Sequence, residues 1–373
     1  MITDKVFLSG SYSSEDVIFL LKEITGLITE QSNEIRENAI GRGVHYSEML
    51  PIEYHPTKEY MDIFYNTLEE NKNVLAGYVA ILSERIINKR GNNLVLVSLA
   101  RAGTPIGILV KRYIELKYNL TLPHYSISII RDKGIDKNAL FYIFKNHPDA
   151  QLQFIDGWTG KGVIQNTLID ACEDLYKEYG IKLNGDLAVL SDPAHCSTTY
   201  ATREDFLIPS ACLNSTVSGL MSRTVCSEKI ISKDDFHGAK FYKDWADIDV
   251  SNFFIDTITE EFGTVCNNPE LHNHITLLNN KVETANYRGL QDVAKIQELF
   301  KIDNINLIKP GVGETTRVLL RRIPWKVLVD STTNPNLKHI IKLAEERNVP
   351  IEVYKDMSYS CCGIIKSKGL SDL

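Results

Sequence analysis

The sequence lacks the features that mark disulfide-bonded, zinc-binding and membrane-spanning proteins. Its seven cysteines form no CxxC pair and are odd in number, so we expect neither a disulfide framework nor a four-thiolate zinc site. No apolar run reaches the length of about 18 residues that a membrane-spanning helix needs, and the N-terminus turns polar within a few residues. We therefore expect a cytoplasmic protein with reduced thiols, without a secretory signal and without a membrane partner.

The composition is that of an ordinary globular protein. Of the 373 residues, 43% are hydrophobic and 24% are charged, which suits one large domain and a smaller one. The net charge of −7 is unevenly distributed, because the residues from Lys301 onward include twelve Lys and Arg against eight Asp and Glu. A basic C-terminal unit can attract nucleic acid, although a solvated helix face would show the same charge.

Continuous apolar runs alternate with helical patterns in the first half of the chain. The apolar runs, typical of buried parallel strands, lie at 93–100, 124–130, 152–156 and 186–192. Apolar residues at helical spacing lie between them, at 105–118, 137–147 and 163–179. This order predicts an α/β fold with a doubly wound parallel sheet, in which ligands bind at the carboxyl ends of the strands.

A second, smaller α/β unit follows after a helical pattern at 290–302. It contains a helix opened near Gly313, a strand at 325–330, a helix at 336–348 and a further strand. We predict three regions, namely a first domain with an N-terminal helical extension at 1–275, a linker helix at 276–300 and a C-terminal domain at 301–373.

Two loops of the first domain are built to hold anions. Backbone N–H groups at the start of a helix, with glycines that let the backbone come close, bind phosphate. Neither loop contains the GxGxxG fingerprint or the spacing of a P-loop. The first loop, a predicted ribose 5-phosphate cradle, is Asp156, Gly157, Trp158, Thr159, Gly160, Lys161 and Gly162. The second, predicted to bind a second anion such as pyrophosphate, is Ala100, Arg101, Ala102 and Gly103.

The stretch "DGWTGKG" resembles the phosphoribosyl pyrophosphate motif of type I phosphoribosyltransferases, and "LARAG" resembles their pyrophosphate loop. The resemblance implies phosphoribosyl pyrophosphate, or a related phosphosugar, as a substrate partner, an unknown acceptor, and Mg²⁺ bound near Asp156. The implied catalytic residues, which gather charge on the leaving group, are Asp156, Arg101, Arg131 and Lys133. Candidates for the acceptor pocket are Asn214, Ser215, Ser218 and His45.

A resemblance to one family covers nearly the whole chain. "SLARAGTPIG", "FIDGWTGKG", "LSDPA" and "IPSACLNSTVSGLMSRT" are similar to segments of the StiP family of tellurite-resistance and stress-response operons. That family is described as a phosphoribosyltransferase with a C-terminal Pelota-type RNA-binding domain, which makes a nucleoside-like product. It is also labelled a cysteine protease.

The C-terminal unit resembles the Pelota and kink-turn-binding fold through "KPGVGETTRVLLRR". The resemblance implies that the unit binds structured RNA, with Gly313 standing where that fold has a base-reading asparagine. Its implied RNA-binding residues are Lys309, Gly311, Gly313, Glu314, Arg317 and Arg321.

Two other functions stay open. A cysteine protease would use Cys212 with His195, and His237 is another possible base. An RNA-binding module on an inactive scaffold would need no catalytic residue. In that case Asp156 would cap a helix and Arg101 would form a salt bridge at the edge of the core.

Overall fold

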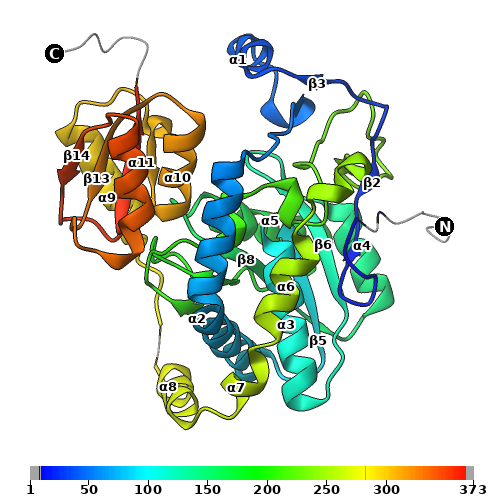
Figure 1. The fold of residues 1–373 in the computed structure, drawn as a ribbon. Coiled ribbons are helices and arrows are strands. Elements are labelled where there is room, and N and C mark those ends of the chain that lie inside the picture. Colours follow the sequence, from blue (N-terminus) through cyan, green and yellow to red (C-terminus); the bar gives the residue numbers. More distant parts are fainter. Residues whose placement is uncertain (1–7, 9, 282, 367–373) are drawn as a thin grey trace.

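The computed structural model describes residues 8, 10–281 and 283–366, and within them the chain forms two α/β units that lie side by side (Figure 1). The last seven residues of the predicted C-terminal domain and one residue of the predicted linker lie outside the described part. Within the described part, no helix combines the length and the apolar character needed to cross a bilayer.

The first unit is built on a parallel sheet with the strand order β1-β6-β5-β8-β9-β10. Its strands are β1 (Ile18–Phe19), β5 (Leu94–Ala100), β6 (His124–Ile130), β8 (Gln151–Trp158), β9 (Leu187–Ser191) and β10 (Thr199–Thr202). A short strand β7 (Gly134–Ile135) pairs antiparallel with β6. The predicted mixed α/β fold with a parallel sheet is confirmed, and its phosphoribosyltransferase-like character stays a prediction.

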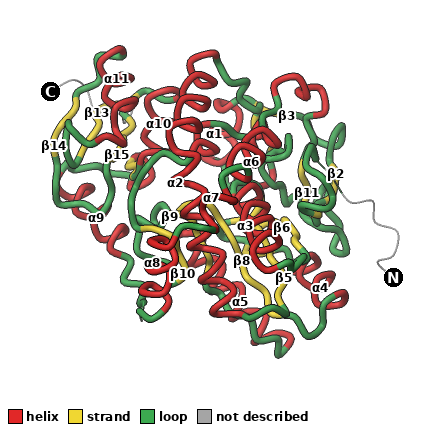
Figure 2. The backbone as a smooth tube through the Cα atoms, turned by 60° about the horizontal axis from the view of Figure 1, so that its bottom comes forward, coloured by secondary structure: helices red, strands yellow, loops and turns green. Residues whose placement is uncertain are grey.

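Helices cover both faces of this sheet, which is why its strands are continuous apolar runs (Figure 2). In β5, Leu94 and Leu96 pack on one side, and Val95, Val97 and Leu99 pack on the other. The first side is covered by α2 (Lys58–Arg90), α3 (Gly103–Tyr118) and α6 (Ser251–Thr259). The second side is covered by α4 (Lys137–Asn146) and α5 (Val163–Tyr179).

Local sequence signals set the ends of these helices. The carboxylate of Asp136 accepts a hydrogen bond from the backbone N–H of Ala139 and so caps the start of α4. Gly162, with φ +78°, precedes α5, and Gly180, with φ +71°, ends it. A left-handed residue just past the last turn is the usual way to end a helix, and glycine adopts it without strain.

Short elements complete the first unit. They are α1 (Asn33–Gly41), α7 (Phe262–Cys266), α8 (Pro269–Asn279), β2 (Lys22–Glu23), β3 (Glu30–Gln31), β4 (Leu50–Pro51) and β11 (Gly238–Ala239). The segment 203–250 is otherwise irregular, with 3-10 turns and isolated bridges, among them Val225 with Gly238.

The C-terminal unit is a four-stranded sheet of order β12-β15-β13-β14 with three helices. Its strands are β12 (Ile308–Pro310), β13 (Pro324–Val329), β14 (Ile351–Val353) and β15 (Cys361–Ile365). Its helices are α9 (Arg288–Leu299), α10 (Val312–Arg321) and α11 (Lys338–Glu346).

Polar contacts join the two units. The buried carboxylate of Asp205 accepts hydrogen bonds from the backbone N–H groups of Val312 at 3.0 Å and Ser360 at 2.9 Å. Arg321 of α10 donates to the hydroxyl of Tyr60 in the first turn of α2 at 2.7 Å. α11 reaches the same turn through an ion pair between Arg347, which follows it, and Glu59 at 3.4 Å. Long-range contacts of this kind fix the second unit against the first.

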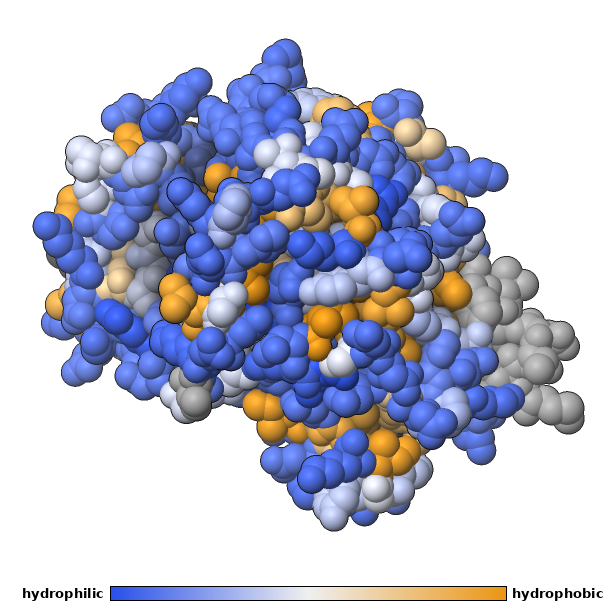
Figure 3. Space-filling view, turned by 90° about the horizontal axis from the view of Figure 1, so that it is seen from below, coloured by the Kyte–Doolittle hydropathy of each residue, from blue (hydrophilic) through white to orange (hydrophobic). Residues whose placement is uncertain are grey.

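The surface seen from below is mainly hydrophilic, and its hydrophobic residues form small separate patches (Figure 3). Scattered exposed apolar residues of this kind are normal on globular proteins.

Candidate functional site

The predicted phosphate loop lies at the carboxyl end of β8, directly before α5. Asp156 accepts a hydrogen bond from the backbone N–H of Gly157 at 2.8 Å, and its desolvation raises the pKa of the carboxyl to about 7. Thr159 donates its hydroxyl hydrogen to Asp192 at 2.5 Å. The ammonium group of Lys161 donates to the carbonyl of Ile305 in the C-terminal unit at 2.6 Å. Two of the side chains predicted to hold phosphate are thus engaged by the protein itself.

The second predicted loop lies beside the first. Arg101 forms an ion pair with the buried Glu53 at 2.8 Å and donates to the carbonyl of Met221. Gly103 opens α3, and a Cβ atom there would lie 2.5 Å from the carbonyl oxygen of Ile155, so glycine permits the close approach of α3 to β8. Arg101 and Gly103 therefore have structural roles: the first pairs with a buried carboxylate, and the second allows α3 to pack closely on β8.

The two loops and α10 enclose a small cavity of about 160 Å³. Its lining includes the predicted residues Arg101, Ala102, Asp156, Gly157, Trp158, Asn214, Ser218, Gly313, Glu314 and Arg317. His45 is not among the residues that line this cavity. Its Nδ1 atom lies 2.8 Å from the hydroxyl of Ser47 at a 3-10 turn. Ser215 is buried next to the cavity residues, and its hydroxyl finds no partner among the described residues.

No group of three or more His, Cys, Asp or Glu side chains that could hold a metal ion occurs in the described part of the chain. Asp156 offers one carboxyl group, and burial raises its pKa to about 7. Mg²⁺, in contrast, prefers ionised oxygen ligands. Binding of Mg²⁺ near Asp156 stays a prediction.

A cysteine nucleophile must be reachable and must lose its proton. Cys212 is fully buried, and burial raises the pKa of its thiol to about 12. Cys196 is 2% exposed and faces the Asp192 carboxylate at 3.6 Å, so burial and this negative charge both raise the pKa of its thiol. Cys361 and Cys362 lie in the core of the C-terminal unit. None of these four thiols is placed for attack on a substrate.

His195, predicted to pair with Cys212, has other neighbours. Its backbone carbonyl accepts hydrogen bonds from Asn286 and Tyr287, just before α9. Burial, followed by the charge of Arg203, lowers the pKa of its imidazole. Cys212, in contrast, has Arg317 and Arg321 as its charged neighbours. The described contacts do not bring this predicted pair together.

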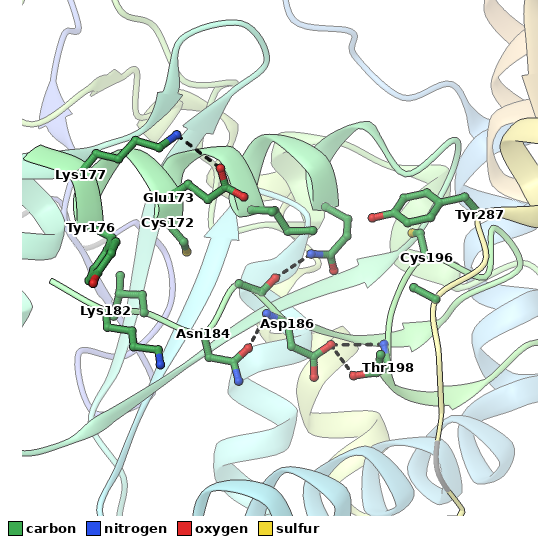
Figure 4. Close-up of a pocket in the computed structure, with 15 residues that line it drawn as sticks. Cys172, Glu173, Tyr176, Lys177, Lys182, Asn184, Asp186, Cys196, Thr198 and Tyr287 are labelled. Carbon is green, nitrogen blue, oxygen red and sulfur yellow. Dashed lines mark hydrogen bonds and ion pairs between the residues drawn. The ribbon is translucent and has the colours of Figure 1, made fainter. Parts of the chain in front are cut away.

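A cavity of about 710 Å³ between α5 and the segment 182–186 contains two thiols, those of Cys172 and Cys196 (Figure 4). Burial raises the pKa of Cys172 to about 11. Among the described residues, those that line this cavity include no histidine that could act as a base. Its floor is tied together by hydrogen bonds from Thr198 to Asp186, which Figure 4 draws.

Two cysteines of the described part are partly exposed, Cys226 and Cys266. The carbonyl of Cys266 accepts from Lys117, and the same ammonium group lies 3.2 Å from Nε2 of His272. That contact occupies the ring nitrogen that would otherwise serve as a base. Cys226 has a different surrounding.

Cys226 and His237 flank an isolated antiparallel bridge between Val225 and Gly238. Val225 and Gly238 exchange both backbone hydrogen bonds, each at 2.8 Å. Cys226 directly follows one bridge partner and His237 directly precedes the other, and the charges of Lys133 and Asp136 act on the pKa of both. Both residues line one groove of about 630 Å³.

The neighbours of His237 hold its ring in place. Its Nδ1 atom lies 2.8 Å from the hydroxyl of Ser128, and its backbone N–H donates to the carboxylate of Asp136 at 2.6 Å. Burial lowers the pKa of the imidazole and so favours its neutral form. In the tautomer whose Nδ1–H donates to the Ser128 hydroxyl, Nε2 is the nitrogen that can accept a proton.

The charge of the thiol is under two opposing influences. Burial raises the pKa of Cys226, and the ammonium group of Lys133 opposes that rise. Lys133 donates to the carbonyl of Cys226 at 3.1 Å and lies 3.5 Å from a carboxylate oxygen of Glu48. Because burial raises the pKa of the thiol and lowers that of the His237 imidazole, both shifts favour the neutral forms, which are suited to proton transfer at the moment of attack rather than to a permanent ion pair.

We call this cavity the thiol groove, and define it by Cys226, His237, Lys133 and the apolar side chains of Phe141 and Ile231. The predicted residue Lys133 thus belongs to it, whereas Arg131 lies on the neighbouring surface with its guanidinium 3.2 Å from Asp132. Sequence reasoning named His237 but missed Cys226. No motif spacing connects the two residues, because an isolated bridge in an irregular segment brings them together.

Comparisons with known proteins agree on the family. A family model described as "Tellurite-like stress resistance cysteine protease StiP" matches residues 10–259, and one described as "PELOTA RNA binding domain" matches residues 287–367. A protein of Acinetobacter baylyi named "Cysteine protease StiP" is 34% identical over 356 residues, which cover 93% of this chain and 91% of that protein.

The predicted phosphoribosyltransferase activity is therefore wrong. Both the matched family and the relative are named as cysteine proteases, and neither supports phosphoribosyl pyrophosphate as a partner. The contacts of the loops fit this correction, because the charge of Arg101 is matched by Glu53 and the hydroxyl of Thr159 is bound to Asp192. The alternative expectation, a cysteine protease, agrees with the comparisons, as does the predicted Pelota domain.

Proposed function

This chain belongs to the StiP family, and from that membership we propose that it is a cysteine protease of stress resistance with Cys226 as nucleophile and His237 as general base. The observation that carries the assignment is the pair itself. A partly exposed thiol and an imidazole flank the Val225–Gly238 bridge and line the same groove. Among the described cysteines, Cys226 alone combines partial exposure with a groove that a histidine also lines.

The pair can perform acyl transfer in two steps. His237 accepts the thiol proton at Nε2 while Sγ of Cys226 attacks the peptide carbonyl carbon, and the C–N bond then breaks as the imidazolium gives its proton to the leaving amine. Water, deprotonated by the same imidazole, then hydrolyses the thioester and releases the acid. The ammonium group of Lys133 supplies positive charge beside the thiolate.

Ser128 and Asp136 act as positioning residues. Ser128 holds Nδ1, and Asp136 fixes the backbone of His237 while it caps α4. The rate gain from a positioned general base is typically about a hundredfold to ten-thousandfold. The side chains of Phe141 and Ile231 give the groove an apolar wall that suits hydrophobic substrate residues.

The test is cleavage of a fluorogenic peptide library and of unfolded casein by the full chain. Cys226→Ser should abolish turnover, and His237→Gln should lower kcat by about a hundredfold or more, while both variants unfold at the wild-type temperature. Cys266→Ser, the matched control at the other partly exposed cysteine, should keep full activity. Full activity in Cys226→Ser would refute the assignment of the nucleophile, and an inactive wild type would refute the proteolysis itself.

A second function, RNA binding by the C-terminal unit, is favoured by the match of residues 287–367 to the Pelota model. Two cationic side chains of this unit, Lys309 and Arg317, lie near the first unit, since both line a cavity with residues of that unit and Arg317 donates to the carbonyl of Ala211. The finer fold assignment, a phosphoribosyltransferase-like sheet, is supported by the parallel order β6-β5-β8-β9 and by the crossover helices α3 and α5.

A further inference from the structure

A second groove, between the two units, carries positive charge in excess. It has a volume of about 830 Å³, and we call it the junction groove. Its cationic side chains come equally from both units and are Arg131, Lys161, Arg223, Lys309, Arg317 and Arg322. The acidic side chains that line it are Asp156 and Glu314. An arrangement of six cations around two acids attracts a polyanion.

Acids match only part of this charge. Glu314 pairs with Arg317 at 2.8 Å and Asp132 pairs with Arg131 at 3.2 Å. Burial, in contrast, raises the pKa of the Asp156 carboxyl to about 7 and so weakens its negative charge. Burial, together with the nearby charge of Lys309, lowers the pKa of Lys161 to about 8. The cations of the junction groove therefore repel one another, and a bound anion would relieve that repulsion.

Aromatic rings stand between the cations. The guanidinium groups of Arg131 and Arg223 lie 5.4 Å and 4.7 Å from the centre of the Tyr46 ring. Trp158 lines the groove from the end of β8. Sites for single-stranded nucleic acid combine these two features, because cations follow the phosphates and rings stack on the bases.

The residues of the C-terminal unit that were expected to meet RNA all face the first unit. Gly311 contacts Trp158, Gly313 lies against Ala211, and Arg321 stacks on Tyr54 at 4.4 Å. Lys309, Glu314 and Arg317 line the junction groove itself. An RNA strand that reaches this side of the unit must therefore also touch the first unit.

We propose that the junction groove binds single-stranded RNA, with the phosphates on cations of both units and unstacked bases against Tyr46 and Trp158. The proposal rests on the RNA binding suggested above for the C-terminal unit and adds that the first unit supplies half of the cations. A double helix hides its base faces from such rings, whereas a single strand offers them. A bound RNA strand would then lie near the thiol groove. Arg131 lines the junction groove, and Lys133, two residues later in the chain, lines the thiol groove.

The experiment measures fluorescence anisotropy of a labelled short polyuridine strand with the full chain over a range of salt concentrations. The variants are Arg131→Gln in the first unit and Arg322→Gln in the second, two exposed side chains that line the groove from different units. Each should raise Kd about threefold to tenfold and reduce the slope of log Kd against log salt by about 0.7. Tyr46→Leu should raise Kd at least about fivefold without changing the slope, because it removes stacking and no charge. The matched control, Lys338→Gln on the exposed side of α11, makes the same change of charge and should leave Kd unchanged.

Three outcomes would overturn the proposal. If polyuridine binds and the groove variants bind it like the wild type, the site lies elsewhere and RNA binding by the chain survives. If the wild type binds uridine monophosphate as tightly as polyuridine, the groove takes a nucleotide and not a strand. If no RNA binds at any salt concentration, both the groove and the RNA binding of the C-terminal unit are refuted.

Discussion

Replacing Gly311 by alanine should loosen the junction between the two units. Gly311 precedes α10 with φ +88° and ψ 157°, a backbone region that only glycine adopts freely. A Cβ atom at this position would lie 2.3 Å from Cζ2 of Trp158 and 3.2 Å from a carboxylate oxygen of Asp205. Alanine therefore brings both backbone strain and a clash with the first unit.

The size of the effect follows from these two contributions. A residue held in such a backbone conformation costs about 1–3 kcal/mol. Overpacking a well-filled contact by one methyl group costs about 1–3 kcal/mol more. The sum, roughly 2–6 kcal/mol, is a large part of the 5–15 kcal/mol by which domains of ordinary stability resist unfolding.

Urea unfolding followed by tryptophan fluorescence measures this loss of unfolding free energy. Trp158 is a suitable probe, because it is the side chain that the added methyl group would displace. The matched control is Gly77→Ala in α2, where a Cβ atom meets nothing within 4 Å and φ is not positive. That substitution should raise the unfolding free energy by up to about 1 kcal/mol, since alanine favours the helix. A midpoint of Gly311→Ala equal to that of the wild type would refute the description of the junction.

Two further predictions concern pH. Burial raises the pKa of Asp205 to about 7 from an ordinary 3.8, so its contribution to stability is complete below about pH 4 and is lost as the pH rises to about 7. The stability difference between the wild type and Asp205→Asn, measured by urea unfolding, should therefore shrink over that interval, and a constant difference would contradict the reasoning. Because burial raises the pKa of Cys226, its rate of alkylation by iodoacetamide should keep rising up to pH 9. Lys133→Met should slow alkylation at every pH, and a plateau below pH 8 would argue against a neutral resting thiol.

Much of the fold was accessible from periodicity alone. The expected strand at 124–130 and helix at 163–179 coincide with β6 and α5, because both carry long, uninterrupted patterns. β15 gave no such signal. Its adjacent cysteines and a glycine, "CCGII", have little of the β-branched character that marks a strand, although it pairs with both β12 and β13 in the middle of its sheet.

The candidate site was less accessible, because its contacts join distant residues. The salt bridge of Arg101 depends on Glu53, which lies 48 residues earlier in the chain and outside both predicted loops. The hydrogen bond of Thr159 depends on Asp192, 33 residues later. Cys226 and His237 belong to an irregular segment, where hydrophobic period carries no information. Sequence reasoning therefore found the loops and could not tell that their polar groups were already occupied.

The contact of α2 with the C-terminal unit has a consequence for the order of events during synthesis. Tyr60 and Glu59, in the first turn of this 33-residue helix, bind Arg321 and Arg347, which are made 261 and 288 residues later. While the ribosome is still translating the first unit, the C-terminal unit cannot yet cover the start of α2. Tyr60, which is buried in the complete fold, is then more exposed to water. In a nascent chain, the start of the longest described helix therefore lacks these two partners until residues 321 and 347 have been synthesised.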